Sequence, residues 1–200
     1  CFSFFPSKNL GGFGDGGLVT TGSDSYAQKI LKLRVHGSSK RYYHDEIGIN
    51  GRLDALQAVV LMIKLKHLKA WLNARTQKAL YYNELISNKG VTDLLAIPYV
   101  ERNNVHTYHQ YTLRLIGKNS SAKMRDDLCA HLHKNGVGAM VYYPVPIHLQ
   151  KCYLHLGLKK GSYPVSEACA DLVFSLPIFP ELTDNEQAYI VDILVDFFNR

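Results

Sequence analysis

The chain begins with the stretch CFSFFPSKNLGGFGDGGLVTT, residues 1–21. Its two ends, residues 1–5 and 17–21, are rich in aromatic or β-branched side chains, which are typical of strands. Between them lie a Pro-Ser-Lys-Asn turn at residues 6–9 and a glycine-rich bend at residues 11–17. The stretch therefore predicts two short strands joined by a compact loop.

Lys8 is the candidate catalytic residue of this loop, since it follows Phe4, Phe5 and Pro6 directly after a short strand. A lysine in apolar surroundings loses proton affinity and becomes a nucleophilic amine that can form a Schiff base. A single lysine is more often a solvated surface residue, so the turn alone leaves both interpretations open.

The glycine-rich bend also contains a formal G-x-G-x-x-G at Gly12, Gly14 and Gly17. In a dinucleotide-binding fold this motif ends a strand and opens a helix. Here the strand-like residues 18–21 follow it, and no Gly-Lys-Ser/Thr completes a Walker A loop. The bend therefore predicts neither kind of nucleotide loop.

A long helical segment follows a polar loop at residues 36–51. Residues 52–89 contain neither glycine nor proline, and apolar side chains recur along them at helical spacing. We expect one long helix, broken at most once. Its predicted core stripe comprises Leu53, Leu56, Val60 and Ile63, followed by Leu61, Leu65, Leu68 and Leu72.

The second half of the chain mixes strands and helices. Beyond residue 90 we expect strands at 95–100, 107–116 and 138–143 and helices at 122–134 and from 183 onward. In the first half, a short helix is expected at residues 25–33, before the long one. Thr183 and Glu186 form a capping-box pattern at the start of the last helix. The fold class predicted from this order is α/β or α+β.

Composition excludes several classes of protein. The net charge is +6, 46% of the residues are hydrophobic, and no apolar run approaches the roughly 18 residues of a membrane span. We therefore expect a soluble, cytoplasmic protein that binds neither membrane nor nucleic acid. The whole positive excess lies in residues 1–90, where a basic segment suits a small phosphorylated ligand or forms a solvated face: Lys29, Lys32, Arg34, Lys40 and Arg41.

No metal site is expected. The four cysteines, at positions 1, 129, 152 and 169, lack ligand spacing, so buried reduced thiols are the favoured interpretation. Five histidines show no metal-binding pattern and are interpreted as surface or satisfied core residues: His106, His131, His133, His148 and His155.

Four ordered motifs resemble the DegT/DnrJ/EryC1/StrS family of sugar aminotransferases, which use pyridoxal phosphate. SFFPSKNLG at residues 3–11 is similar to the segment that forms the family's internal aldimine, and GINGRLDALQA at 48–58 resembles its G-x-N-x-R-x-D-x-x-Q-A segment. YHQY at 108–111 resembles a family strand, and YYPVPIH at 142–148 with SLPIFP at 175–180 resembles the C-terminal domain.

The resemblance implies the C-terminal part of a fold-type I pyridoxal-phosphate-dependent transferase. Residues 1–52 would be a remnant of the large domain, residues 53–89 the connecting helix, and residues 90–200 the small α+β domain. The implied activity is transfer of an amino group from glutamate to a keto sugar nucleotide, most similar to enzymes of 3-keto sugars, in the synthesis of precursors for surface polysaccharide or lipopolysaccharide.

The resemblance also assigns roles to individual residues. Lys8 would hold the cofactor as an aldimine and then shuttle the proton, and Ser3 would bind the cofactor phosphate. In a homodimer, Asn50 would reach the partner's cofactor phosphate and Arg52 the sugar nucleotide, while His109, Tyr142 and Tyr143 would line the substrate site. From the residues alone, Asn50 could simply cap a helix, Arg52 could lie in a solvated first turn, and the two tyrosines could be opposite faces of a strand.

About as much chain again precedes the lysine segment in family members, and it supplies the acid that faces the pyridine nitrogen. The sequence, which opens on Cys1, therefore suggests a fragment of a longer enzyme. The alternatives are a split enzyme that pairs with a separate N-terminal chain and a decayed remnant. A catalytically inactive remnant or a regulatory protein is the rival function. A dehydratase of the family is disfavoured because such members carry His in place of Lys8.

Overall fold

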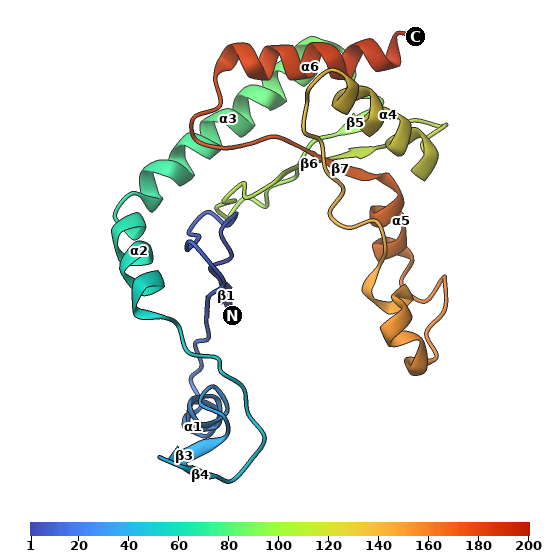
Figure 1. Ribbon diagram of the computed structural model, residues 1–200. Helices are drawn as coiled ribbons and strands as arrows, with labels where there is room; N and C mark the ends of the chain where they lie inside the picture. The colour runs from blue at the N-terminus through green and yellow to red at the C-terminus, as the bar shows by residue number, and fades with distance from the viewer. The chain divides into compact units, whose positions relative to one another are not determined.

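The computed structural model describes residues 1–200 and divides into two compact units, Cys1–Ala70 and Trp71–Arg200 (Figure 1). The first unit contains β1 (Phe2–Ser3), β2 (Gly17–Leu18), α1 (Asp24–Leu33), β3 (Ser38–Lys40), β4 (Tyr43–His44) and α2 (Ala55–Leu65). Helix α3 (Leu68–Asn88) begins just before the boundary. The second unit continues with β5 (Leu95–Ala96), β6 (Tyr111–Leu115), α4 (Ala122–Lys134), the 3-10 helices η1 (Ile147–Leu149) and η2 (Lys151–Leu156), α5 (Pro164–Leu172), β7 (Val173–Leu176) and α6 (Asp184–Phe198).

The predicted long helix is confirmed, with its single break at residues 66–67 between α2 and α3. The predicted apolar stripe does not form a core on α2, however. Leu61 is the one buried hydrophobic side chain of the first unit, and Leu56 is 81% exposed. Helical periodicity identifies an apolar face but not what covers it.

The first unit is built from two small antiparallel hairpins. Strand β1 pairs with β2, with Phe2 opposite Leu18 and Ser3 opposite Gly17, as the two predicted strands required. The second hairpin, β3 with β4, lies inside the stretch expected to be a polar loop. Its strands are too short to show an alternating pattern in sequence.

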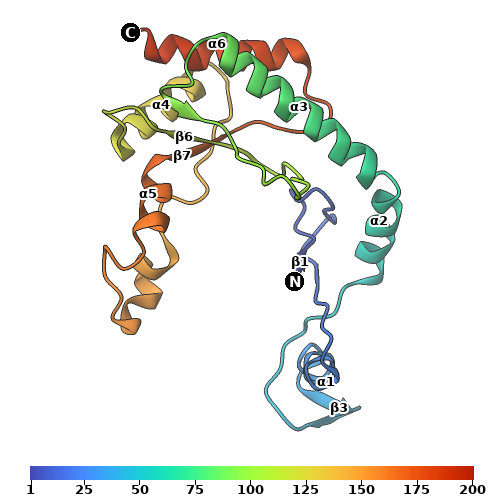
Figure 2. The same cartoon turned by 180° about the vertical axis from the view of Figure 1, so that it is seen from behind.

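The second unit has a three-stranded antiparallel sheet in the order β5-β6-β7. The central strand β6 places Leu113 opposite Phe174 of β7, and both side chains are fully buried. Figures 1 and 2 show α3 and α6 on one side of this sheet and α5 on the other. Every second side chain of β6 is buried: Tyr111, Leu113 and Leu115. These three side chains belong to a core shared with α3, α4 and α6.

Two helix predictions in this unit are confirmed and one strand prediction is wrong. Helix α4 has the predicted bounds, and α6 begins at the predicted capping box, in which the Thr183 amide donates to Glu186 Oε2 at 2.8 Å. Residues 138–143 do not form a strand: only Met140 bridges, to Ser175. Pro144 and Pro146 follow and have no amide hydrogen for a ladder, so the chain leaves the sheet there.

The expectation of buried thiols is wrong for two of the four cysteines. Cys129 is buried and Cys169 half-buried, whereas Cys1 and Cys152 are exposed. None of the helices combines the length and apolar content that a membrane span requires. The functional division at residues 52 and 89 stays a prediction.

Candidate functional site

Lys8 lies on a tight turn that backbone hydrogen bonds fix at both ends. The Phe4 amide donates to Gly16 O at 2.8 Å, and the Gly12 amide donates to Phe4 O at 2.8 Å. Within the turn the Lys8 amide donates to Phe5 O at 2.8 Å, and the Lys8 side chain is half-buried. The local fold thus presents a lysine on a rigid loop, as the sequence predicts.

Ser3 lies on the same loop, at the end of β1. Its hydroxyl accepts a hydrogen bond from the Phe5 amide at 3.3 Å and is otherwise exposed. A primary amine and a hydroxyl are the chemical groups that bind an aldehyde and a phosphate. The chemistry of Lys8 and Ser3 is therefore compatible with pyridoxal phosphate, which carries an aldehyde and a phosphate group.

Helix α2 fastens the glycine-rich bend through contacts that the sequence analysis did not anticipate. Gln57 Oε1 accepts a hydrogen bond from the Phe13 amide at 2.7 Å, and Lys64 Nζ donates to Gly11 O at 2.5 Å. In the sequence, Gln57 stood out only as part of the motif at residues 48–58, and nothing indicated this contact. Gln57 and Lys64, each more than forty residues beyond its partner, therefore hold the loop that carries Lys8.

Gly11 is the position where this loop has no room for a side chain. A Cβ atom there would lie 2.3 Å from Pro6 O and 2.7 Å from Phe5 O, both backbone atoms. The Gly11→Ala substitution should therefore displace the turn, and we expect the amides of Lys8 and Gly12 to exchange with solvent about tenfold faster or more in NMR measurements. Gly22→Ala is the matched control, because nothing lies within 4 Å of its Cβ. Equal exchange in the two variants would contradict this account.

Asn50 and Arg52 lie on the exposed chain between β4 and α2. Asn50 bridges to Val35, and the Gly51 amide donates to Arg34 O at 2.8 Å, so backbone contacts fix this segment on the end of α1. The alternative roles, Asn50 as a helix cap and Arg52 as a residue of the first helical turn, are both wrong. Asp54, not Asn50, is the N-cap of α2, and Arg52 precedes the first turn. Both side chains are exposed, which is compatible with contacts outside this chain.

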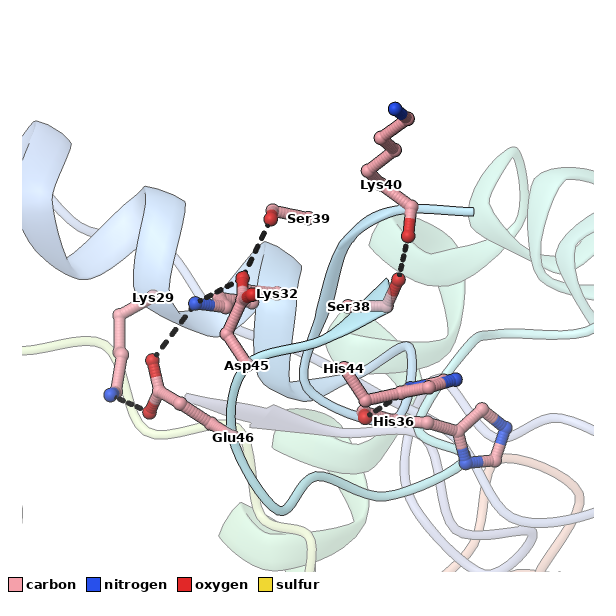
Figure 3. Close-up of polar contacts among 9 residues, drawn as sticks. All are labelled: Lys29, Lys32, His36, Ser38, Ser39, Lys40, His44, Asp45 and Glu46. Atoms are coloured by element: carbon pink, nitrogen blue, oxygen red, sulfur yellow. Dashed lines mark hydrogen bonds and ion pairs between the residues drawn. The ribbon is translucent and has the colours of Figure 1, made fainter. Parts of the chain in front are cut away.

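The basic segment is partly neutralised by acids that follow it in sequence (Figure 3). Lys29 pairs with Glu46, and Lys32 pairs with Asp45 at 2.9 Å and with Glu46 at 3.2 Å. The hydrogen bond from Lys32 lowers the pKa of the Asp45 carboxyl, and that from Lys29 lowers the pKa of Glu46. Both lysines are thus engaged within the chain.

The remaining cations of this segment make no ion pair. Lys40 and Arg41 lie over tyrosine rings, with Lys40 Nζ 4.8 Å from the Tyr43 ring centre and the Arg41 guanidinium carbon 4.9 Å from that of Tyr42. Of the five cations, Arg34, Lys40 and Arg41 therefore remain without an acidic partner, and the choice between a site for a phosphorylated ligand and a solvated face stays open.

In the second unit, Arg75 positions the segment that carries His109. Arg75 Nη1 donates to three backbone carbonyls, those of Tyr108 at 3.1 Å, His109 at 3.5 Å and Ile178 at 2.8 Å. Burial lowers the pKa of this guanidinium. The sequence did not predict that Arg75 holds this segment, because a single arginine within a helix is usually a solvated surface residue.

Tyr142 and Tyr143 line a cavity of about 510 Å³ between residues 142–150 and α5. Their rings meet edge to face at 5.6 Å, and the side chains of Tyr142 and Tyr143 are 37% and 70% exposed. No strand exists there, so the interpretation as opposite strand faces is wrong. The other lining residues are Pro144, Val145, Pro146, Ile147, Gln150, Ser166, Cys169 and Ala170, and His109 is not among them.

The histidines outside these sites have protein partners. His131 Nε2 lies 3.1 Å from Ile193 O, and His148 Nε2 lies 2.9 Å from Glu167 Oε1. No group of three His, Cys, Asp or Glu side chains is placed to hold a metal ion.

Comparison with known proteins identifies the class. The family model described as the DegT/DnrJ/EryC1/StrS aminotransferase family matches residues 1–195, and the chain belongs to this family. The family is pyridoxal-phosphate dependent, and the relatives include aminotransferases that act on sugar nucleotides. The predicted fold class, part of a fold-type I transferase, is confirmed.

Individual relatives are similar over the whole chain. It is 43% identical to the pleiotropic regulatory protein of Geobacillus stearothermophilus, covering 100% of this chain and 51% of that protein. It is 39% identical to the UDP-N-acetyl-3-dehydro-alpha-D-glucosamine 3-aminotransferase of Acidithiobacillus ferrooxidans, covering 97% and 49%. The chain thus spans about half the length of these relatives.

Solved structures also match nearly the whole of this chain over about half of their own length. The S. venezuelae DesV structure in complex with a ketimine intermediate matches with a TM-score of 0.86 at 36% identity, covering 100% of this chain and 51% of that one. The Bacillus subtilis NtdA structure with bound PMP matches with a TM-score of 0.83 at 25% identity, covering 99% and 45%.

Proposed function

We propose that the chain is the C-terminal half of a pyridoxal-phosphate-dependent aminotransferase that transfers an amino group from glutamate to a keto sugar nucleotide. The observation that carries the proposal is the rigid turn of Lys8, fastened by Gln57 and Lys64 in a member of this family. A 3-keto sugar is favoured because relatives named for 3-keto or 3-amino sugars match at 36–39% identity.

The bound cofactor would supply an electron sink for the carbon that loses its proton. Lys8 Nζ would hold the cofactor and then carry the proton taken from the substrate carbon. Ser3 Oγ would donate a hydrogen bond to the phosphate. Lys8 is the acid–base group, and Ser3 orients the cofactor against it.

The other site residues would bind substrate and partner subunit. In a homodimer, the exposed amide of Asn50 would reach the partner's cofactor phosphate, and Arg52 would attract the diphosphate of the sugar nucleotide. Tyr142 and Tyr143 would contact the sugar nucleotide at the wall of their cavity, and His109 would approach it from the segment that Arg75 fixes. Synthesis of surface polysaccharide precursors in the cytoplasm is the role that fits these substrates.

An N-terminal half of the protein is part of the proposal. The chain spans half of its relatives, and apolar side chains of α2 lie exposed, among them Leu56, Val59, Met62 and Ile63. A contiguous apolar face of this kind marks an interaction surface. The exposed apolar face of α2 is explained if the N-terminal half of the enzyme covers it.

The test is covalent trapping of the cofactor. We expect the purified chain with added pyridoxal phosphate to develop an absorbance band near the visible edge, and borohydride reduction followed by peptide mass mapping to place the label on Lys8. Labels scattered over surface lysines, with no band, would contradict the assignment of Lys8 within this chain.

A regulatory role is the second candidate, favoured by the name of the Geobacillus stearothermophilus relative. It predicts that the cofactor binds without turnover. The two functions are separated by mixing the chain with the N-terminal half of an aminotransferase relative, pyridoxal phosphate, glutamate and a keto sugar nucleotide that accepts the amino group. Only the enzyme would form 2-oxoglutarate over repeated turnovers.

A further inference from the structure

The cavity lined by Tyr142 and Tyr143 has two walls, and they come from different segments. One wall is residues 142–150, which leave the sheet after Met140, and the other is Ser166, Cys169 and Ala170 of α5. Only one residue of the segment 141–150 is buried, and that is His148, at 6% exposure. The first wall therefore contains one buried side chain, that of His148.

His148 joins the two walls through Glu167 of α5. The distance between His148 Nε2 and Glu167 Oε1 is 2.9 Å, and no other hydrogen bond connects residues 141–150 with α5. The His148 ring also meets the Tyr163 ring edge to face at 4.9 Å. Loss of this contact would leave the cavity's first wall without a polar attachment to its second.

Glu167 is itself fixed by the loop before α5. Its two carboxylate oxygens each accept from the Gly161 amide at 2.8 Å, and Oε1 also accepts from the Tyr163 amide at 3.2 Å. The Gly161 amide is the largest cause of a lowered pKa at Glu167, followed among the favourable contacts by His148. The carboxylate is therefore ionised at neutral pH, and His148 Nε2 carries the proton that it donates.

We propose that His148 and Glu167 are positioning residues that hold the Tyr142–Ile147 wall of the substrate cavity against α5. Neither touches the reacting atoms. Glu167 organises the loop at 161–163 and orients the imidazole, and the imidazole sets where the two tyrosines lie. This inference rests on the proposed function only in calling the cavity a sugar-nucleotide site.

The first test measures the mobility of the wall by NMR amide exchange on the chain. In Glu167→Gln we expect the Gly161 amide to exchange about tenfold faster or more, because the charged two-oxygen acceptor is replaced by a neutral amide with a single acceptor oxygen. In His148→Leu, which keeps the bulk but cannot donate, we expect the Leu149 and Gln150 amides to exchange faster by a similar factor, with new chemical shifts for Tyr142 and Tyr143.

Two further variants separate hydrogen bonding from packing. His148→Gln places an amide donor near the position of Nε2, so it should restore the exchange rates to within about threefold of the wild type, as expected for a rescued hydrogen bond. Glu84→Gln makes the same chemical change on an exposed part of α3 and should alter nothing. Circular dichroism checks that each variant retains its helices. If His148→Leu behaves like the wild type, or His148→Gln like His148→Leu, the proposal is wrong.

The second test uses UDP-N-acetylglucosamine as the probe, with its affinity measured by chemical-shift titration. We expect about tenfold weaker binding in His148→Leu and nearly unchanged binding in His148→Gln. Equal affinity in all variants, despite a mobile wall, would overturn a positioning role. Absence of probe binding in the wild type would count against the proposed substrate, and the exchange and shift data would then decide the positioning role alone.

Discussion

Replacing Lys8 should abolish cofactor trapping in this chain. In Lys8→Ala no amine remains on the turn, and in Lys8→Arg the guanidinium keeps the charge but stays protonated and does not react with an aldehyde. We expect borohydride-stable label at position 8 to vanish in both variants and the absorbance band to disappear with it. Quantitative peptide mass mapping at equal pyridoxal phosphate concentration is the measurement.

Lys40→Ala is the matched control for this result. Lys40 is exposed and lies in the same unit, and its side-chain ammonium lies over the Tyr43 ring. Its loss should leave both the label at Lys8 and the absorbance band unchanged. If the Lys8 variants keep the band, or if Lys40→Ala loses as much label as they do, the amine that binds the cofactor is not Lys8.

Replacing Phe174 should remove a large part of the stability of the second unit. Phe174 is fully buried on β7 opposite Leu113, at the centre of the core shared by the sheet and its helices. Truncating a buried phenylalanine to alanine costs about 3–5 kcal/mol, because transfer energy and a cavity add. A typical domain has a free energy of unfolding of only about 5–15 kcal/mol, so this loss should lower the stability of the second unit substantially.

Urea denaturation checks this expectation, and fluorescence of Trp71, the single tryptophan, can report it from the start of the second unit. Phe179→Ala removes the same atoms from a side chain that is 39% exposed and should lower the free energy of unfolding by clearly less. Equal losses for the two variants would show that β7 does not carry the core.

Local signals explain which elements could be predicted from sequence. Helix α4 has an N-cap serine and a terminating Asn-Gly within a few residues of its ends, so both its bounds could be predicted, and the capping box predicted where α6 begins. Strand β7 and the β3–β4 hairpin were missed because strands of two to four residues show no usable alternation. The apolar face of α2 was recognised, but its exposure depends on what covers it, which no periodicity reveals.

The candidate site divides in the same way. The turn of Lys8 was predictable because proline, glycine and lysine lie within one short stretch. The contacts that hold the site in place join residues far apart in sequence: Gln57 to Phe13, Arg75 to His109, and His148 to Glu167. Their partners become visible only when the chain is folded. Motif resemblance predicted which side chains act, and these roles stay predictions, but it gave no indication of which side chains support them.

The ion pairs of Lys29 and Lys32 with Asp45 and Glu46 have a consequence for the loop that leads to Asn50. Exposed charge pairs weaken as ionic strength rises, since at 0.15 M salt the Debye length is only about 8 Å. The acidic pair lies a few residues before Asn50, so concentrated salt would loosen the segment that carries Asn50. Subunit association, if it uses this loop, would then respond to salt through the order of the loop as well as through charges at the interface.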